Sequence, residues 1–66
     1  MKKLYYTSYN RDDKYWRDIY VYEIVNDQTK LWFELEAYDS TFDEDEIQTW
    51  LDNNEFENRE YNFYQL

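Results

Sequence analysis

Alternation of apolar and polar residues predicts three consecutive strands in the N-terminal half of the chain. The expected strands are Lys3–Tyr9, Trp16–Val25 and Lys30–Asp39. The polar cluster Asn10–Lys14 separates the first two strands. Asn26–Thr29 is expected to form a hairpin loop, because Asn and Asp tolerate the left-handed backbone that glycine provides in other proteins. The pattern therefore predicts an antiparallel meander.

The two faces of this meander should differ in chemistry, since successive side chains of a strand point to opposite faces. The apolar face is expected to carry Ile19, Val21, Val25, Leu31, Phe33, Leu35 and Ala37. The opposite face is expected to carry Trp16, Asp18, Tyr20, Tyr22, Ile24, Trp32, Glu34, Glu36 and Tyr38. The first set is predicted to form the core.

A helix is predicted after the meander. Thr41 stands three residues before Glu44, which is the spacing of a capping box, and the acidic residues around Glu44 complement the helix dipole. An apolar stripe at helical spacing follows, formed by Ile47, Trp50 and Leu51. The helix is expected to end at Asn53 and Asn54.

The segment Phe56–Leu66 is predicted to be a final strand that returns to an edge of the sheet. Its alternation places Tyr61 and Phe63 on one face and Tyr64 and Leu66 on the other. The expected fold is α+β, a single domain over residues 1–66 with the order β-β-β-α-β and one helix on one sheet face. Since one helix cannot cover both faces, an open aromatic face remains, and such a face is normally a binding surface.

Composition limits how so small a chain can be stabilised and what chemistry it can perform. With 66 residues and neither Cys nor His, disulfides and the common zinc sites are excluded. Heavy aromatic packing, at 24% of residues, or a homodimer must supply the stability instead. No apolar run reaches the length of a membrane span, and no signal peptide is visible, so the cytoplasm is the expected compartment.

Charge is distributed unevenly along the chain. Residues 1–30 carry a balance of +1, whereas residues 31–66 carry −10, where Arg59 is the one basic residue. Such a field repels nucleic acid and anionic membranes and attracts basic protein surfaces. The basic residues of the first half could form a small patch: Lys2, Lys3, Arg11, Lys14 and Arg17.

Catalysis and metal binding are poorly supported by the residues present. Nucleophilic catalysis lacks its usual base, and paired-carboxylate chemistry needs a cleft that so small a chain cannot build. The run Asp43–Glu46 lacks the alternation and the glycine of a calcium loop. We therefore expect neither an enzyme nor a metal or cofactor site.

The acidic half admits two interpretations, and both remain open at this point. The carboxylates can simply keep an aromatic-rich domain in solution. Alternatively, they can imitate a nucleic-acid backbone, since outward residues two apart on a strand, such as Glu34 and Glu36, lie about 6.6 Å apart. The array would be extended by Asp43, Glu44, Glu46, Asp52, Glu55, Glu57 and Glu60.

In length, acidity and Tyr/Trp richness the chain resembles the small acidic proteins with which phages and mobile elements block host enzymes. These include anti-restriction proteins, anti-CRISPR proteins and uracil-DNA glycosylase inhibitors. The absence of Gly and Pro, with a single Ala, suggests the codon bias of an AT-rich genome, and this bias adds to the resemblance together with the absence of Cys. The resemblance implies stoichiometric occlusion of a target in the host cytoplasm and carries over no individual residue.

The leading hypothesis is a non-enzymatic inhibitor that binds the basic surface of a host nucleic-acid-processing or defence protein. Its expected partner-binding residues are Tyr20, Tyr22, Trp32, Glu34, Glu36, Tyr38, Asp43, Glu44 and Glu46. The alternative is a homo-oligomer with a structural role or one that sequesters a nucleotide, with Arg11, Lys14 or Arg17 holding the phosphates.

Overall fold

The computed structural model describes residues 2–13, 15–54 and 61–66, and it confirms the α+β fold and the order β-β-β-α-β. The elements are β1 (Lys2–Asn10), β2 (Trp16–Val25), β3 (Gln28–Tyr38), α1 (Asp43–Asn53) and β4 (Tyr61–Gln65). The strand bounds agree with the sequence pattern to within two residues for β1, β2 and β3. The predicted strand residues 56–60 lie outside the described residues.

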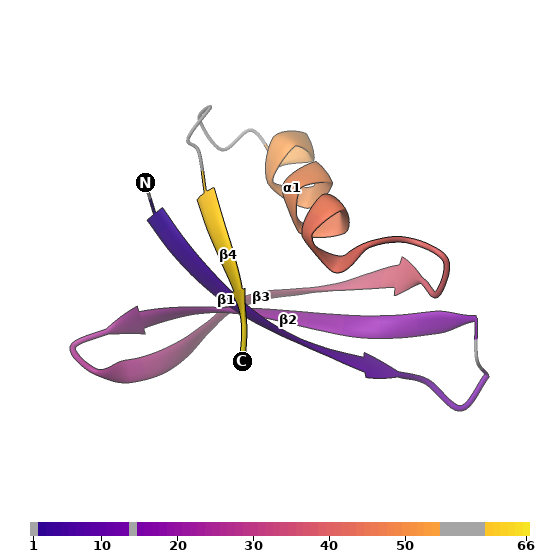
Figure 1. The fold of residues 1–66 in the computed structure, drawn as a ribbon, viewed down its shortest axis with the longest axis horizontal. Coiled ribbons are helices and arrows are strands. Elements are labelled where there is room, and N and C mark those ends of the chain that lie inside the picture. The colour runs from indigo at the N-terminus through magenta and orange to yellow at the C-terminus, as the bar shows by residue number, and fades with distance from the viewer. Residues whose placement is uncertain (1, 14, 55–60) are drawn as a thin grey trace.

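The four strands form one mixed sheet in the order β3-β2-β1-β4. Strand β2 pairs antiparallel with both β1 and β3, which is the predicted meander. Strand β4 lies at the edge beside β1 and runs parallel to it, with Leu4 opposite Phe63. The sequence predicted that the last strand lies at an edge of the sheet, but it did not predict which edge or in which direction the strand runs. Strand β4 is parallel to β1 because the chain crosses over the sheet through α1 before it returns (Figure 1).

The β2–β3 hairpin closes through Asn26 and Asp27, whose φ angles are 52° and 63°. Two consecutive residues in the left-handed region form the two-residue turn that matches the twist of antiparallel strands. Asn and Asp are the residues other than glycine that reach this region at the lowest cost. The expected turn chemistry is therefore confirmed.

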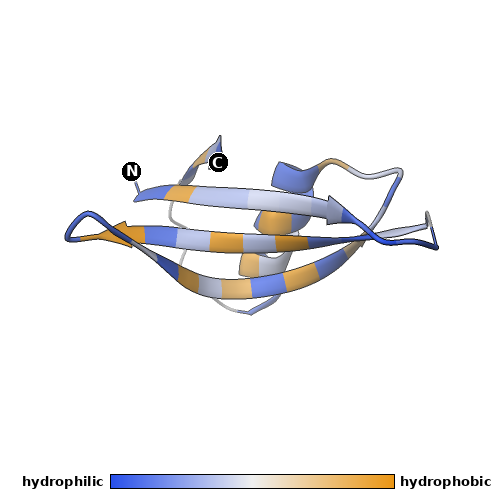
Figure 2. Cartoon of the chain, turned by 90° about the horizontal axis from the view of Figure 1, so that it is seen from below, coloured by the Kyte–Doolittle hydropathy of each residue, from blue (hydrophilic) through white to orange (hydrophobic). Residues whose placement is uncertain are grey.

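Helix α1 packs on one face of the sheet, and the core lies between them (Figure 1). Its buried residues are Leu4, Tyr6, Ile19, Val21, Phe33, Ala37, Ile47 and Leu51. At the β3 side, Trp50 stacks on Phe33 with ring centroids 3.7 Å apart and planes within 8°. No helix of the described residues lies on the opposite face of the sheet, which Figure 2 shows from that side. We call this second face the open face.

A β-bulge changes the predicted orientation of residues in β3. Val21 pairs with Phe33, but its neighbour Tyr22 pairs with Leu31, so Trp32 is the extra residue. A bulge allows two successive side chains to turn to the same side of the sheet. Trp32 therefore packs beside Phe33 against the core, at 5.1 Å between ring centroids, and Leu31 is 56% exposed. The predictions of a core Leu31 and an open-face Trp32 are wrong.

Val25, which was also expected in the core, is exposed. It pairs with Gln28 at the tip of the β2–β3 hairpin, which extends away from α1 in Figure 1. The alternation of β2 was correct, but the helix is too short to cover the whole length of the strand.

The start of α1 differs from the predicted capping box. The N-cap residue is Phe42, and its side chain makes no capping hydrogen bond. The Thr41 hydroxyl instead donates to the carbonyl oxygen of Tyr38 at 2.9 Å and accepts a hydrogen bond from Arg17 at 3.2 Å. Thr41 therefore closes the turn that connects β3 to α1.

Arg17 lies on the core face of β2 and is 5% exposed, so it does not belong to the basic patch expected from the sequence. Its guanidinium donates to Asp43 Oδ1 at 2.5 Å, to the carbonyl oxygen of Tyr38 and to Thr41. A buried cation is costly unless it is paired and hydrogen-bonded, and these three acceptors meet that requirement. Through these hydrogen bonds Arg17 connects the β3–α1 turn to strand β2.

Candidate binding surface

The open face is lined by tyrosines and a tryptophan from four strands. The strand registers place on it Lys3, Tyr5, Thr7, Tyr9, Trp16, Asp18, Tyr20, Tyr22, Ile24, Thr29, Leu31, Glu34, Glu36, Tyr38, Asn62 and Tyr64. Strands favour such aromatic residues because they pack well against cross-strand neighbours. The same alternation that buries Ile19 and Val21 beneath α1 turns Tyr20 and Tyr22 to the other side. The predicted aromatic face therefore exists, with Trp32 absent from it.

Contacts between neighbouring strands hold these rings in place. Trp16 stacks on Tyr38 with ring centroids 4.1 Å apart. The Tyr9 and Tyr20 rings lie 5.8 Å apart, the Tyr5 and Tyr64 rings lie 5.6 Å apart, and the Tyr22 hydroxyl lies 3.4 Å from the Thr7 hydroxyl. Ring pairs of this kind are favourable beyond the area that they bury. The surface is consequently formed before any partner arrives, which lowers the entropy lost on binding.

Neighbouring strands β2 and β3 also place carboxylates on the open face. Asp18 of β2 faces Glu36 of β3, and Arg11 reaches both: its guanidinium lies 2.6 Å from Asp18 Oδ1 and 3.0 Å from Glu36 Oε1. The hydrogen bonds from Arg11 hold the pKa of Asp18 below its ordinary value. Burial raises the pKa of Tyr20, and the charges of Asp18 and Glu34 act in the same direction. Within the described part of the chain, Glu34 forms no ion pair, so its charge faces the solvent.

The predicted acidic residues of the helix lie on the other side of the sheet. Asp43 is engaged by Arg17, and Glu44 Oε2 accepts a hydrogen bond from the Tyr6 hydroxyl at 2.9 Å. Burial raises the pKa of Tyr6 to about 12, with further contributions from Glu44 and Asp43. Glu46 lies in the same first turn and is partly buried. These acids therefore stabilise the start of α1, through the helix dipole and through two tertiary contacts.

The nine residues expected to bind a partner consequently divide into three groups. The open face brings together Tyr20, Tyr22, Glu34, Glu36 and Tyr38. The first turn of α1 holds Asp43, Glu44 and Glu46. Trp32 lies apart from both, on the core side of the sheet, where the Lys2 ammonium group stands 4.9 Å from its ring centroid. A single continuous acidic and aromatic array is therefore not present.

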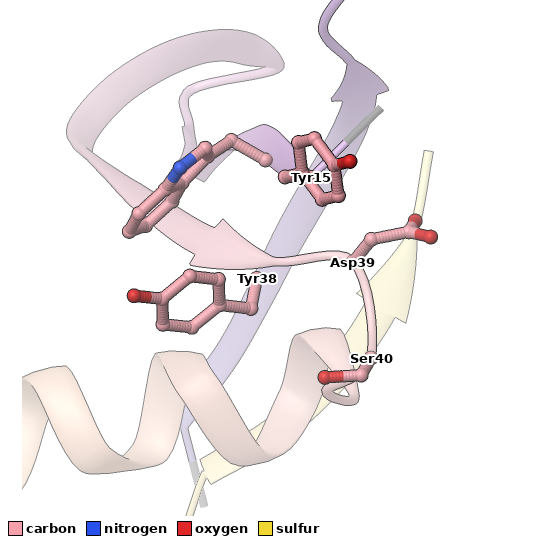
Figure 3. Close-up of a pocket in the computed structure, with 5 residues that line it drawn as sticks. Tyr15, Tyr38, Asp39 and Ser40 are labelled. Carbon is pink, nitrogen blue, oxygen red and sulfur yellow. The ribbon is translucent and has the colours of Figure 1, made fainter. Parts of the chain in front are cut away.

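A pocket of about 560 Å³ opens at one end of the open face, and sequence reasoning did not identify it as a site. It is lined by Tyr15, Trp16, Tyr38, Asp39 and Ser40 (Figure 3). These residues come from the start of β2 and the end of β3, which meet because Trp16 pairs with Tyr38. In the sequence, the adjacent aromatic residues Tyr15 and Trp16 were the one indication of this pocket. The other wall, which includes Tyr38, is set by the strand register and could not be read from the sequence.

The basic residues required by the nucleotide-binding alternative are largely engaged. Arg17 is buried beneath the sheet, Arg11 is paired with two carboxylates, and Lys14 lies outside the described residues. Holding a phosphate with Arg11 would require breaking its bonds to Asp18 and Glu36. The β2–β3 part of the open face is therefore better suited to cations than to anions, whereas Lys3 adds a positive charge at the β1–β4 side, 6.0 Å from the Tyr64 ring.

Comparison of this chain with protein-family models, with curated proteins and with solved structures found no match. Among the described residues, no helix has the length and the apolar character needed to cross a membrane. In the same ranges, no three metal-ligating side chains lie close enough together to hold an ion.

Proposed function

We propose that this protein is a non-enzymatic binding protein of the phage inhibitor type. It occludes the basic surface of a nucleic-acid-binding or defence protein of the host and uses the open face to do so. The observation that carries this proposal is the aromatic sheet face, which no element of the described chain covers and whose rings are held by cross-strand contacts.

Aromatic rings on a rigid sheet are suited to the centre of a protein interface. Tyr and Trp bury a large area at little cost in side-chain entropy, and they dominate the residues whose truncation weakens complexes most. Tyr20 and Tyr22 lie on the open face of β2, which is one of the two inner strands of the sheet. They are the expected anchors.

Charge supports a basic partner. The chain carries a net charge of −9. Glu34 projects from edge strand β3 beside Tyr20, without an ion pair among the described residues. Such charges increase the rate of encounter with a cationic surface and disfavour anionic ones. In this proposal the helix acids contribute to the long-range field, whereas Glu34 and the rings make the contact.

The proposal is tested by competition with DNA. The protein is immobilised, host lysate is passed over it, and bound proteins are eluted between about 50 and 500 mM NaCl, a range over which electrostatic attraction is strongly screened. Each captured protein is then bound to fluorescent duplex DNA, and free inhibitor is added. We expect stoichiometric displacement of the DNA, which weakens as salt is raised.

Matched variants identify the surface involved. Tyr20→Ser is expected to weaken displacement by about 30-fold, as for a central anchor. Glu34→Gln should weaken it by about 5-fold, mainly through slower association. Asp27→Asn removes the same charge at the hairpin tip, where Asn also tolerates the positive φ, and should leave displacement unchanged. Captured proteins that keep their DNA, or equal losses for Glu34→Gln and Asp27→Asn, would contradict the proposal.

A further inference from the structure

The pocket at the end of the open face has walls that are fixed by backbone contacts. The Asp39 amide donates to the carbonyl oxygen of Tyr15 at 2.9 Å, which joins the two segments that line the pocket. Beneath them, Arg17 donates to the carbonyl oxygen of Tyr38. Both segments that line the pocket are therefore held by hydrogen bonds to backbone carbonyl oxygens, although the Tyr15 residue itself is 73% exposed.

The described lining of the pocket favours positive charge over negative charge. Three aromatic rings, the Asp39 carboxylate and the Ser40 hydroxyl surround the space, and none of the described lining residues is basic. Aromatic faces carry negative potential and bind cations, and the attraction grows as the cation loses water. In Figure 3 the Asp39 carboxylate points away from Tyr38, whereas the Ser40 hydroxyl points toward the side on which Tyr38 lies. The carboxylate therefore contributes mainly through its field.

The arrangement of the rings favours a flat cation. Trp16 and Tyr38 stack on each other at 4.1 Å, so nothing fits between them, and they do not form a cage around a spherical group. They form a two-ring stack instead, a platform on whose outer ring face a flat group can lie. A guanidinium group is planar, stacks on aromatic faces and is weakly hydrated, whereas an ammonium group is compact and strongly hydrated.

The chain's own Arg11 shows that the open face accepts this group. Its guanidinium bridges Asp18 and Glu36, which lie two residues along β2 and β3 from Trp16 and Tyr38. The pocket is the next position along the same pair of strands, and no arginine of the described chain is among its lining residues. We propose that it binds the guanidinium group of an arginine side chain presented by the partner protein. This inference rests on the proposed function and names the side chain that the basic partner inserts.

The test uses the intact protein and small probes. The indole N–H signal of Trp16 is followed by ¹H–¹⁵N NMR and assigned by its loss in Trp16→Phe. N-acetyl-arginine amide is titrated beside N-acetyl-citrulline amide, a neutral molecule of nearly the same shape, and beside N-acetyl-lysine amide. For a single side chain we expect saturable binding of the arginine probe with a Kd on the order of 10 mM. The lysine probe should bind more weakly, and the citrulline probe should give no saturable shift.

Three variants complete the test. Tyr38→Leu removes half of the platform and should weaken binding of the arginine probe at least about 5-fold, and Asp39→Asn should weaken it about 2- to 3-fold. Asp27→Asn, the matched carboxylate control, should have no effect. Equal binding of citrulline or tighter binding of lysine would overturn the guanidinium assignment, as would an arginine affinity that Tyr38→Leu leaves unchanged.

The outcome is separable from that of the proposed function. If the arginine probe binds as expected while captured proteins keep their DNA, the pocket stands and the inhibitor function fails. If DNA is displaced and Tyr38→Leu displaces it equally well, the inhibitor function stands and the pocket is not used for an arginine of the partner.

Discussion

The buried contact between Arg17 and Asp43 should determine whether this small protein remains folded. Arg17 lies on central strand β2 and Asp43 is the first residue of α1, so their ion pair joins the helix to the sheet across 26 residues of chain. The Arg17 side chain is 6% exposed and that of Asp43 is 24% exposed. We propose to replace them by Met and Asn, singly and together, since both substitutions approximately preserve volume.

The expected magnitudes follow from this burial. Removing one partner of a fully buried pair costs about 3–5 kcal/mol because the other charge is left uncompensated. Arg17→Met leaves behind the partly hydrated Asp43 carboxylate, so we expect it to cost about 2 kcal/mol. Asp43→Asn leaves the buried Arg17 guanidinium without its counter-charge, so we expect it to cost about 3 kcal/mol, with a coupling energy of about 1–2 kcal/mol between the two changes. A domain of this size has a total stability of about 3–10 kcal/mol, so either change is a large fraction of it.

Urea unfolding, followed by tryptophan fluorescence and circular dichroism, measures these free energies. If Arg17→Met does not fold, Arg17→Lys keeps the charge but cannot reach all three acceptors, and it should be intermediate in stability. Arg11→Met is the control, since its pair on the open face is solvated and contributes little. A coupling energy below about 0.5 kcal/mol would show that Arg17 and Asp43 act independently and that the ion pair does not fasten the helix.

Two further predictions concern the start of α1. The pKa of Tyr6 is raised from 10.0 to about 12, so the folded state favours the neutral phenol, and this stability is present below pH 10 and lost as pH rises toward 12. Between pH 9 and 11 the wild-type protein should therefore lose about 1 kcal/mol more than Tyr6→Phe in urea unfolding, and equal losses would contradict the assignment. Phe42 is the N-cap, is 77% exposed and offers no oxygen to the helix. Phe42→Ser should raise the free energy of unfolding by about 1 kcal/mol, whereas Phe42→Ala should not, and equal stabilities of these two variants would refute the capping argument.

The fold could be derived from the sequence because its signals are local. Alternation identified β1, β2 and β3, the Ile47 and Leu51 stripe identified α1, and Asn26-Asp27 identified the hairpin turn. Each of these features depends on side-chain direction or on backbone preference within a few residues. The open aromatic face followed from the same alternation together with the presence of one helix. Five of the nine expected binding residues accordingly lie on it.

The sequence alone could not decide which of several suitable residues would occupy a given place. Leu31 and Trp32 are both apolar, and the bulge that turns Trp32 toward the core depends on packing beside Phe33 and on the Lys2 side chain of a distant strand. The charge of Arg17 predicted an exposed position. Arg17 is buried because residues of β3, of α1 and of the turn between them supply three hydrogen-bond acceptors. The pocket required Tyr15 and Asp39 to meet through the strand register. Local periodicity therefore determined the elements and their faces, and tertiary packing decided the contacts between residues far apart in the chain, because their energies depend on partners that local sequence does not specify.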